Sequence, residues 1–199
     1  MKAKFFLITA ILLVISTVHL SFTSIKNQYI LDSGHTFIGF DVERFMVGEV
    51  SGRFNEFTGN MTLDNEDFTT LKVEITINAS SIDTNHETRD RHLKGGMWLD
   101  TENYPEIKFI STQVAINDNG EYIMVGNFTI KGVTKVVEFP VKILGPFMDP
   151  TKKMTLGIKA DFEIDRSDYG IKFNKKMDNG SFFIDNKVKI KIRSLAYRK

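Results

Sequence analysis

The chain has 199 residues and a formal net charge of +1, from 26 basic and 25 acidic residues. This length fits one domain preceded by a targeting segment, because domains commonly contain about 100–200 residues. The near-neutral charge, without a stripe of lysine and arginine, excludes DNA and RNA as expected partners. The absence of cysteine excludes disulfides, iron–sulfur clusters and thiol nucleophiles, and the 17 phenylalanines must fill a core or line an apolar pocket.

The N-terminus has the pattern of an export signal. Lys2 and Lys4 precede an uncharged apolar run, FFLITAILLVISTV, which has the length of a signal-peptide hydrophobic region. We therefore predict a signal peptide over residues 1–24 and a domain over residues 25–199 that is periplasmic or otherwise exported and has no permanent membrane span. The expected cleavage region, residues 21–24, lacks a clean small-residue motif, so a membrane tether formed by an uncleaved segment is the alternative.

Most of the remaining chain alternates apolar and polar residues, which is the period of a half-buried β-strand. In HTFIGFDVER, Ile38, Phe40 and Val42 share one face, and Arg44 lies in phase with them. The glycines of the next stretch, residues 50–63, are expected to mark bulges or bends. Further strands are expected at residues 71–79, 106–112, 122–131, 135–144, 155–166 and 187–193.

Seven or eight strands with one polar face each, joined by short turns such as Asn119-Gly120, indicate an all-β fold. This pattern fits an antiparallel barrel or a two-sheet sandwich. A barrel leaves no strand edge exposed, and about eight strands enclose room for one small ligand. The in-phase residues Arg44 and Arg166 favour the barrel, because a charge on an apolar face is costly unless it is paired or meets a ligand.

Four stretches carry recognisable motifs: YILDSGHTFIGFDVERFMVGEVSGRF, SIDTNHETRDRHLKGGMWLDTENYPEIKF, GNFTIKGVTKVVEFPV and DRSDYGIKF. In order and spacing they resemble the YceI-like lipid/polyisoprenoid-binding family, from Tyr29 to the C-terminus. The resemblance implies an extended lipocalin-like antiparallel eight-stranded barrel with a short helical insert, usually exported to the bacterial periplasm, that holds a long isoprenoid chain in its interior. Two positions depart from the family pattern: Arg44 stands where histidine is frequent, and Met97-Trp98 where a phenylalanine pair is common.

We therefore predict an exported protein that binds an isoprenoid or other long-chain lipid, for transport, storage or stress response. The predicted apolar lining consists of Ile38, Phe40, Val42, Val73, Ile75, Phe109, Phe128, Phe139, Ile158 and Phe162. The predicted head-group and lid residues are Arg44, Arg89, His92, Trp98 and Arg166. An arginine at position 44 would suit an anionic head group, because a guanidinium offers two parallel hydrogen bonds to phosphate or carboxylate. For each lining residue the alternative is a filled core that binds nothing.

The insert at residues 80–105 is expected to close one opening of the barrel. Asp83 is predicted to cap a short helix, on which Arg89 and His92 share a face and either form a polar collar or tie the insert to a strand. Asp90 and Lys94 are expected to form a solvated pair. Met97, Trp98 and Leu99 are predicted to press an apolar side over the opening.

No enzyme, cofactor or metal site is predicted. His35, His86 and His92 lack the spacing of a zinc site, and no G-x-S-x-G, P-loop or Cys–His arrangement is present. A lipid-modifying enzyme with titratable groups converging in the cavity, and a structural or interaction barrel without ligand, are the alternatives. Whether the protein forms a homodimer is left open.

Overall fold

The structure, a computed structural model, describes residues 26–178, 180 and 182–199, so the predicted signal peptide lies outside the described residues. The strands are β1 (Lys26–Leu31), β2 (Phe37–Arg44), β3 (Gly48–Phe54), β4 (Phe57–Asp64), β5 (Asp67–Asn78), β6 (Ile82–Asp83), β7 (Glu106–Ile116), β8 (Tyr122–Ile130), β9 (Val133–Met148), β10 (Met154–Asp165) and β11 (Ile184–Arg198). The helix α1 spans Glu87–Lys94, and short 3-10 helices occupy Ser33–His35, Ala79–Ser81 and Arg166–Tyr169. None of the described helices has the length and hydrophobicity needed to cross a bilayer.

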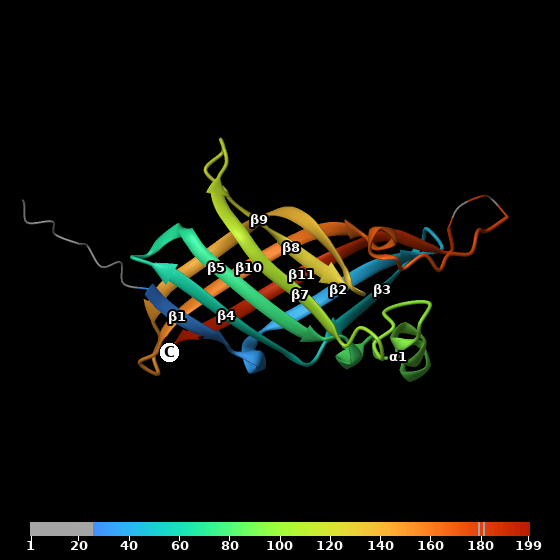
Figure 1. Ribbon diagram of the computed structural model, residues 1–199, viewed down its shortest axis with the longest axis horizontal. Coiled ribbons are helices and arrows are strands. Elements are labelled where there is room, and N and C mark those ends of the chain that lie inside the picture. The colour runs from blue at the N-terminus through green and yellow to red at the C-terminus, as the bar shows by residue number, and fades with distance from the viewer. Residues whose placement is uncertain (1–25, 179, 181) are drawn as a thin grey trace, which may run out of the picture.

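The strands close an antiparallel barrel (Figure 1). The pairing order around it is β1, β4, β5, β7, β8, β9, β10, β11 and back to β1, which gives eight positions. β2 follows β1 along the same side of β11, and β3 pairs with β2 just as β4 pairs with β1. The predicted eight-stranded barrel is confirmed, and the two-sheet sandwich is wrong because the sheet returns to its first strand.

The predicted strands are all present, and several are longer than their sequence pattern indicated. β9 covers Val133–Met148 where residues 135–144 were expected, and β11 covers Ile184–Arg198 where residues 187–193 were expected. A bend at Asn55 and Glu56 separates β3 from β4, and the predicted turn at Asn119-Gly120 joins β7 to β8. The two-residue strand β6 was not expected, since two residues carry no periodicity.

Of the predicted bulges or bends at strand glycines, a bulge is absent at Gly52 and Gly59, because the strand register runs through both positions without a shift. Gly52 instead makes room for a ring. A Cβ atom at this position would lie 2.4 Å from a ring carbon of Phe40. The small residue therefore lets an aromatic side chain of the neighbouring strand lie across the backbone.

The interior is solid at one end. Tyr29, Leu63, Leu71, Leu156 and Ala196 are fully buried and lie where β1 pairs with β4 and with the last residues of β11. They fill this end of the barrel, which we call the filled end. The insert and the loop after β10 lie at the other end, which we call the lid end (Figure 1).

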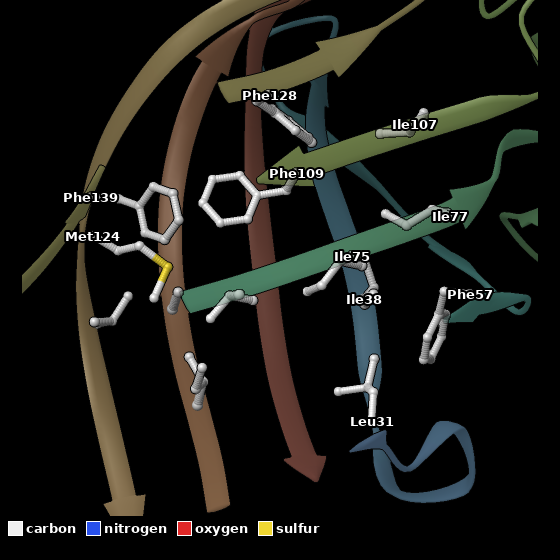
Figure 2. Packing of buried hydrophobic residues seen from close by; sticks show 14 of the residues in the cluster. Leu31, Ile38, Phe57, Ile75, Ile77, Ile107, Phe109, Met124, Phe128 and Phe139 are labelled. Atoms are coloured by element: carbon white, nitrogen blue, oxygen red, sulfur yellow. The ribbon is translucent and has the colours of Figure 1, made fainter. Parts of the chain in front are cut away.

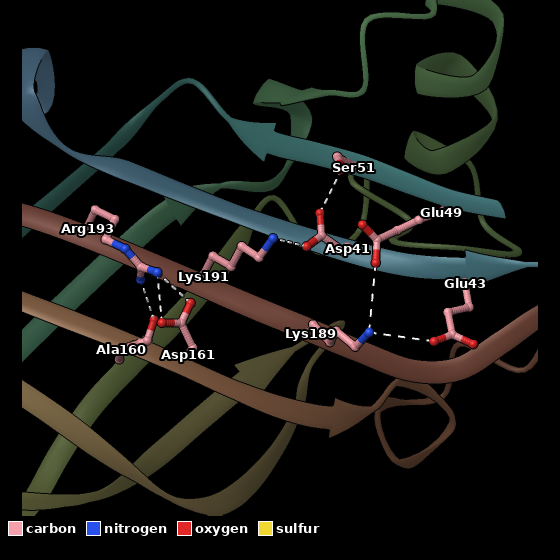
Figure 3. Close-up of polar contacts among 9 residues, drawn as sticks. All are labelled: Asp41, Glu43, Glu49, Ser51, Ala160, Asp161, Lys189, Lys191 and Arg193. Carbon is pink, nitrogen blue, oxygen red and sulfur yellow. Dashed lines mark hydrogen bonds and ion pairs between the residues drawn. The ribbon is translucent and has the colours of Figure 1, made fainter.

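Ion pairs tie the strands together on the outer face of the barrel (Figure 3). The Asp41 carboxylate on β2 is buried and pairs with the Lys191 ammonium of β11, and it accepts a hydrogen bond of 2.7 Å from the Ser51 hydroxyl of β3. Arg193 on β11 donates to both carboxylate oxygens of Asp161 on β10 at 2.7 Å. The polar face of each strand thus contributes cross-strand pairs, while its other face is free to line the interior.

Candidate functional site

An apolar cavity runs through the lid half of the barrel. Its wall includes residues from β2, β3, β4, β5, β7, β8, β9, β10, β11 and the insert, and Arg166 is the one ionisable side chain among the described lining residues. All ten predicted lining residues lie in this wall: Ile38, Phe40, Val42, Val73, Ile75, Phe109, Phe128, Phe139, Ile158 and Phe162. The period-two pattern therefore placed the inward face correctly.

Aromatic rings form the middle of the wall (Figure 2). Phe139 and Phe162 stack with ring centroids 4.0 Å apart and an interplanar angle of 6°. Phe109 faces Phe139 at 5.6 Å, and Phe128 lies 6.3 Å from Phe162. These contacts join β7, β8, β9 and β10 and hold the rings in defined positions beside the cavity.

The cavity is long and narrow. Along β10 its lining runs from Ile158 through alternate residues to Arg166, the residue after the strand. This is about 26 Å at about 3.3 Å per residue, or about 20 Å along the barrel axis for strands tilted by about 40°. The space open to the centre of a water-sized sphere is about 160 Å³. Over a length of about 20 Å, this volume gives the centre of the sphere a path about 3 Å across. Adding the sphere radius of about 1.4 Å on each side gives a channel about 6 Å wide.

This volume is smaller than the roughly 300–1,000 Å³ of common small-molecule sites. Carbon atoms in contact are about 3.5–4.0 Å apart, so a single hydrocarbon chain needs a channel only about 4 Å wide. The cavity therefore accommodates one thin chain and excludes a bulky ring system unless side chains move apart.

The insert covers the lid end, as predicted. Leu93, at the end of α1, and the following residues Trp98 and Leu99 line the cavity. The Lys131 ammonium on the β8–β9 turn donates to the Gly96 carbonyl at 2.7 Å and ties the insert to the barrel. The prediction is wrong for Met97, whose side chain is 67% exposed and takes no part in the lining.

The local geometry of α1 differs from the prediction. The helix is capped by His86, whose Nδ1 accepts from the Arg89 backbone N–H at 3.2 Å, because the chain makes one more turn after Asp83. Asp83 instead accepts from the Asn85 backbone N–H in that turn. The predicted Asp90–Lys94 pair is also absent among the described residues, since Asp90 accepts from the Thr84 backbone N–H at 2.9 Å and from its hydroxyl.

Arg89 and His92 lie outside the described lining of the cavity. The Arg89 guanidinium donates to the hydroxyl and the carbonyl of Thr84, both at 2.7 Å, and so fastens α1 to the segment before it. His92 is exposed, and its carbonyl accepts the Gly95 N–H at the end of the helix. Of the two readings of this pair, the structure places Arg89 as a structural tie rather than a collar at the cavity mouth.

Arg166 lies at the lid end of the cavity, next to Trp98 of the insert. Its side chain is only 4% exposed, and its guanidinium lies 5.5 Å from the Trp98 ring centroid. It donates to the carbonyls of Ile171, Phe173 and Asp185 at 2.9 Å, with a longer contact to a fourth carbonyl. Burial lowers the pKa of Arg166, while nearby carboxylates act in the opposite direction.

Arg44 lies near the same end without lining the cavity. Its guanidinium carbon is 4.5 Å from the Phe45 ring centroid and 5.0 Å from that of Phe183. Its Nε is buried without a hydrogen-bond partner among the described residues. Arg44 is therefore held between two rings with donor capacity unused.

Several lining residues were not selected from the sequence. Val188, Ile190 and Ile192 on β11 and Ile77 on β5 extend the alternating faces already identified, so the same period could have found them. Leu93 and Ile171 lie outside strands and have no periodic signal. Within the described residues, no group of three or more His, Asp or Glu side chains could hold a metal ion.

The fold and the cavity define a class: a closed eight-stranded antiparallel barrel with an apolar interior, filled at one end and covered by an insert at the other. Residues 29–196 match the YceI-like domain. The chain belongs to the YceI-like family.

Individual relatives agree with this assignment. A UPF0312 protein of Shewanella sp. (strain ANA-3) is 35% identical over 149 residues, which is 74% of this chain and 78% of that protein. Among solved structures, BcnA of Burkholderia cenocepacia superposes with a TM-score of 0.72 at 21% identity, covering 83% of this chain and 98% of that one. A polyisoprenoid binding domain from Saccharophagus degradans superposes with a TM-score of 0.63 at 13% identity, covering 86% and 98%. At these identities the structural matches establish the shared fold.

Proposed function

We propose that the barrel binds one long apolar chain, an isoprenoid or a comparable lipid, along its interior, in the periplasm or another exported compartment. The observation that carries the proposal is the continuous apolar wall of the narrow cavity, to which strands around the whole barrel contribute. Burial of a hydrocarbon chain stabilises a complex by about 0.8 kcal/mol for each CH₂ removed from water, so a long chain can bind tightly without polar contacts. The polyisoprenoid binding domain of Saccharophagus degradans, which has the same fold, supports this choice of ligand class.

The head group of the lipid would lie at the lid end, because buried side chains occupy the filled end. Arg44 is the proposed contact for an anionic head group, since its Nε has no hydrogen-bond partner among the described residues. Arg166 is less suited to this contact, because backbone carbonyls already take most of the five N–H donors of its guanidinium.

A lipid-modifying enzyme is the weaker candidate. Acid–base or nucleophilic chemistry needs titratable groups that converge on one point of the site. Among the described lining residues, Ser194 is the single hydroxyl, and it donates to the Ile158 carbonyl at 3.3 Å with no carboxylate or imidazole in the wall beside it. The family and the fold likewise favour a binding protein.

Extraction and mass spectrometry of lipids from protein purified from its native host test the proposal. We expect one long-chain lipid per protein, and Ala160→Phe to abolish it, because Ala160 is buried in the cavity wall and a ring there would block the channel. Ala115→Phe on β7 is the matched control, because Ala115 lies outside the cavity lining, and it should retain the lipid. Recovery of no stoichiometric lipid from the wild type, or equal lipid in both variants, would contradict lipid binding in this cavity.

A further inference from the structure

The lid end carries a group of exposed apolar side chains that the cavity does not use. Phe45, Met46 and Val47 form the turn between β2 and β3, and Phe173 and Phe182 belong to the loop between β10 and β11. We call these five residues the apolar tip. Figure 1 shows the turn and the loop reaching beyond the barrel at the same end, away from the C-terminus. Grouped exposed apolar side chains mark surfaces that contact another apolar phase or molecule.

The apolar tip is joined to the lid of the cavity. The Phe45 backbone N–H donates to the Phe183 carbonyl at 3.1 Å, and the two rings meet edge to face at 4.2 Å, which connects the turn to the loop. The Phe173 ring lies 5.1 Å from the Trp98 ring, and Trp98 lines the cavity. The tip and the lid end of the cavity are thus neighbouring parts of one surface.

The turn keeps apolar residues where the backbone disfavours them. Phe45 has φ of 56° and Met46 has φ of 61°, and successive positive φ values define a turn for which asparagine and glycine are the favoured residues. Met46 is nevertheless 66% exposed and Val47 92% exposed. A strained backbone that displays apolar side chains to solvent indicates that the side chains serve a contact outside the barrel.

Positive charge accompanies the apolar side chains. Lys172, Lys175 and Lys176 are exposed on the loop and make no ion pair within the described residues, and Asp178 is the single acidic residue in residues 170–178. The acidic residues that flank the turn are partly neutralised, since Lys189 lies 3.6 Å from Glu43 and 3.8 Å from Glu49. Apolar side chains beside free lysines are the combination that binds the interface of an anionic bilayer.

We propose that the apolar tip docks the protein on an anionic phospholipid bilayer, with Met46 and Val47 inserted among the lipids and the loop lysines at the level of the phosphates. The lid end of the cavity then faces the membrane. A role of this contact in lipid exchange rests on the proposed function. The contact with the membrane itself requires only the apolar tip and the loop lysines. The tip is at the opposite end of the barrel from the filled end.

Sedimentation with vesicles tests the docking, using residues 26–199, which contain every strand of the closed barrel. We expect binding to vesicles of phosphatidylglycerol and phosphatidylcholine that weakens about tenfold in Met46→Asn, because a methionine side chain no longer leaves water. Asparagine also tolerates the positive φ, so this variant should stay folded. Met148→Asn is the matched control, because Met148 is 58% exposed at the filled end, and it should bind as the wild type does. An equal loss in both variants, or no loss in Met46→Asn, would overturn the proposal.

A second test concerns the charge of the loop lysines. Each of Lys175→Gln and Lys176→Gln should weaken binding to the anionic vesicles about fivefold, and added salt should weaken wild-type binding. Binding that is equally strong to phosphatidylcholine alone would refute the charged part of the contact. If Met46→Asn instead changes the oligomeric state in light scattering and leaves vesicle binding unchanged, the tip is a contact between copies of the chain and membrane docking is wrong.

The two proposals fail separately. Mass spectrometry of extracted lipid reports on the cavity, and vesicle sedimentation reports on the tip. Lipid recovered from a protein that does not sediment with vesicles contradicts docking alone. Vesicle binding by a protein without extractable lipid contradicts lipid carriage alone.

Discussion

Replacement of Arg166 by methionine should destabilise the barrel by about 3 kcal/mol. Methionine keeps a similar length but removes the donors of three hydrogen bonds of 2.9 Å to the carbonyls of Ile171, Phe173 and Asp185. A hydrogen bond that involves a charged group contributes about 1.5–3 kcal/mol, and removing one partner of a buried charged group costs about 3–5 kcal/mol. Because the hydrogen bonds to Phe173 and Asp185 are only partly buried, we expect the lower end of this range.

Equilibrium unfolding in urea measures this loss, with the fluorescence of the single tryptophan, Trp98, as the signal. Arg193→Met is the matched control. Arg193 also bonds backbone carbonyls and pairs with Asp161, but on the outer face, where its side chain is 41% exposed, so its loss should be below about 1 kcal/mol. An unfolding free energy for Arg166→Met within about 0.5 kcal/mol of the wild type, or equal losses in the two variants, would refute the assigned role of Arg166.

A local readout separates this role from general packing. Arg166 holds both sides of the loop between β10 and β11, since its partners include Ile171 at the start of the loop and Asp185 after it. Trypsin should therefore cleave native Arg166→Met faster at Lys172 and Lys175 than it cleaves native Arg193→Met. Equal cleavage rates would show that the loop holds its position without Arg166.

Three further predictions concern pH and the cavity wall. Burial raises the pKa of Tyr169 to about 12 from 10.0, so the stabilisation of the fold by the neutral phenol is present below pH 10 and is lost as pH rises toward 12. In urea unfolding, Tyr169→Phe should therefore lose less free energy of unfolding at alkaline pH than the wild type. Burial alone would raise the pKa of Asp41, but hydrogen bonds from Lys191 and Ser51 bring this pKa below the ordinary 3.8. The stabilisation of the fold by the Asp41 carboxylate is therefore present above that pH and is lost on acidification. The unfolding free energy of Asp41→Asn should fall less than that of the wild type below about pH 4. Phe162→Ala removes the ring stacked on Phe139, so it should lower the urea unfolding free energy by about 3 kcal/mol. It should also widen the channel and increase the affinity for a branched apolar probe. An unchanged affinity would contradict the position of this ring in the wall.

The barrel wall could be predicted from the sequence because apolar and polar residues alternate along each long strand, and this alternation is visible in a short stretch of chain. Alternation in β10 identified Ile158 and Phe162 as inward residues, and the other long strands that line the cavity showed the same pattern, whereas the two-residue β6, which contributes Ile82, did not. The period also placed Arg166 on the inward face, where its side chain is buried. The extra length of β9 was missed because its last residues form a less regular ladder, with a register shift opposite Thr155.

The partners of the polar residues could not be predicted, because they depend on backbone groups brought together by the fold. The carbonyls that surround Arg166 come from residues up to 19 positions away in the chain. His86 took the capping role predicted for Asp83 because the chain makes an additional turn at Asn85, whose φ is 57°. The spacing of side chains alone carries no information about such a turn.

The two ends of the barrel differ in how much must move for a chain to enter. At the filled end, an opening would expose Tyr29, Leu63 and Leu156, and each large apolar side chain returned to water costs about 1.5–3 kcal/mol. At the lid end, the single side chain of Trp98 is half-buried and contacts the Phe173 ring and the Arg166 guanidinium, and the ring contact contributes about 0.5–1.5 kcal/mol beyond the burial of its area. Displacement of Trp98 is thus the smaller rearrangement, so we expect the chain to enter beside it, next to the apolar tip. A Trp98→Ala variant should therefore exchange a bound apolar probe faster than the wild type in stopped-flow measurements, and an unchanged exchange rate would place the entrance elsewhere.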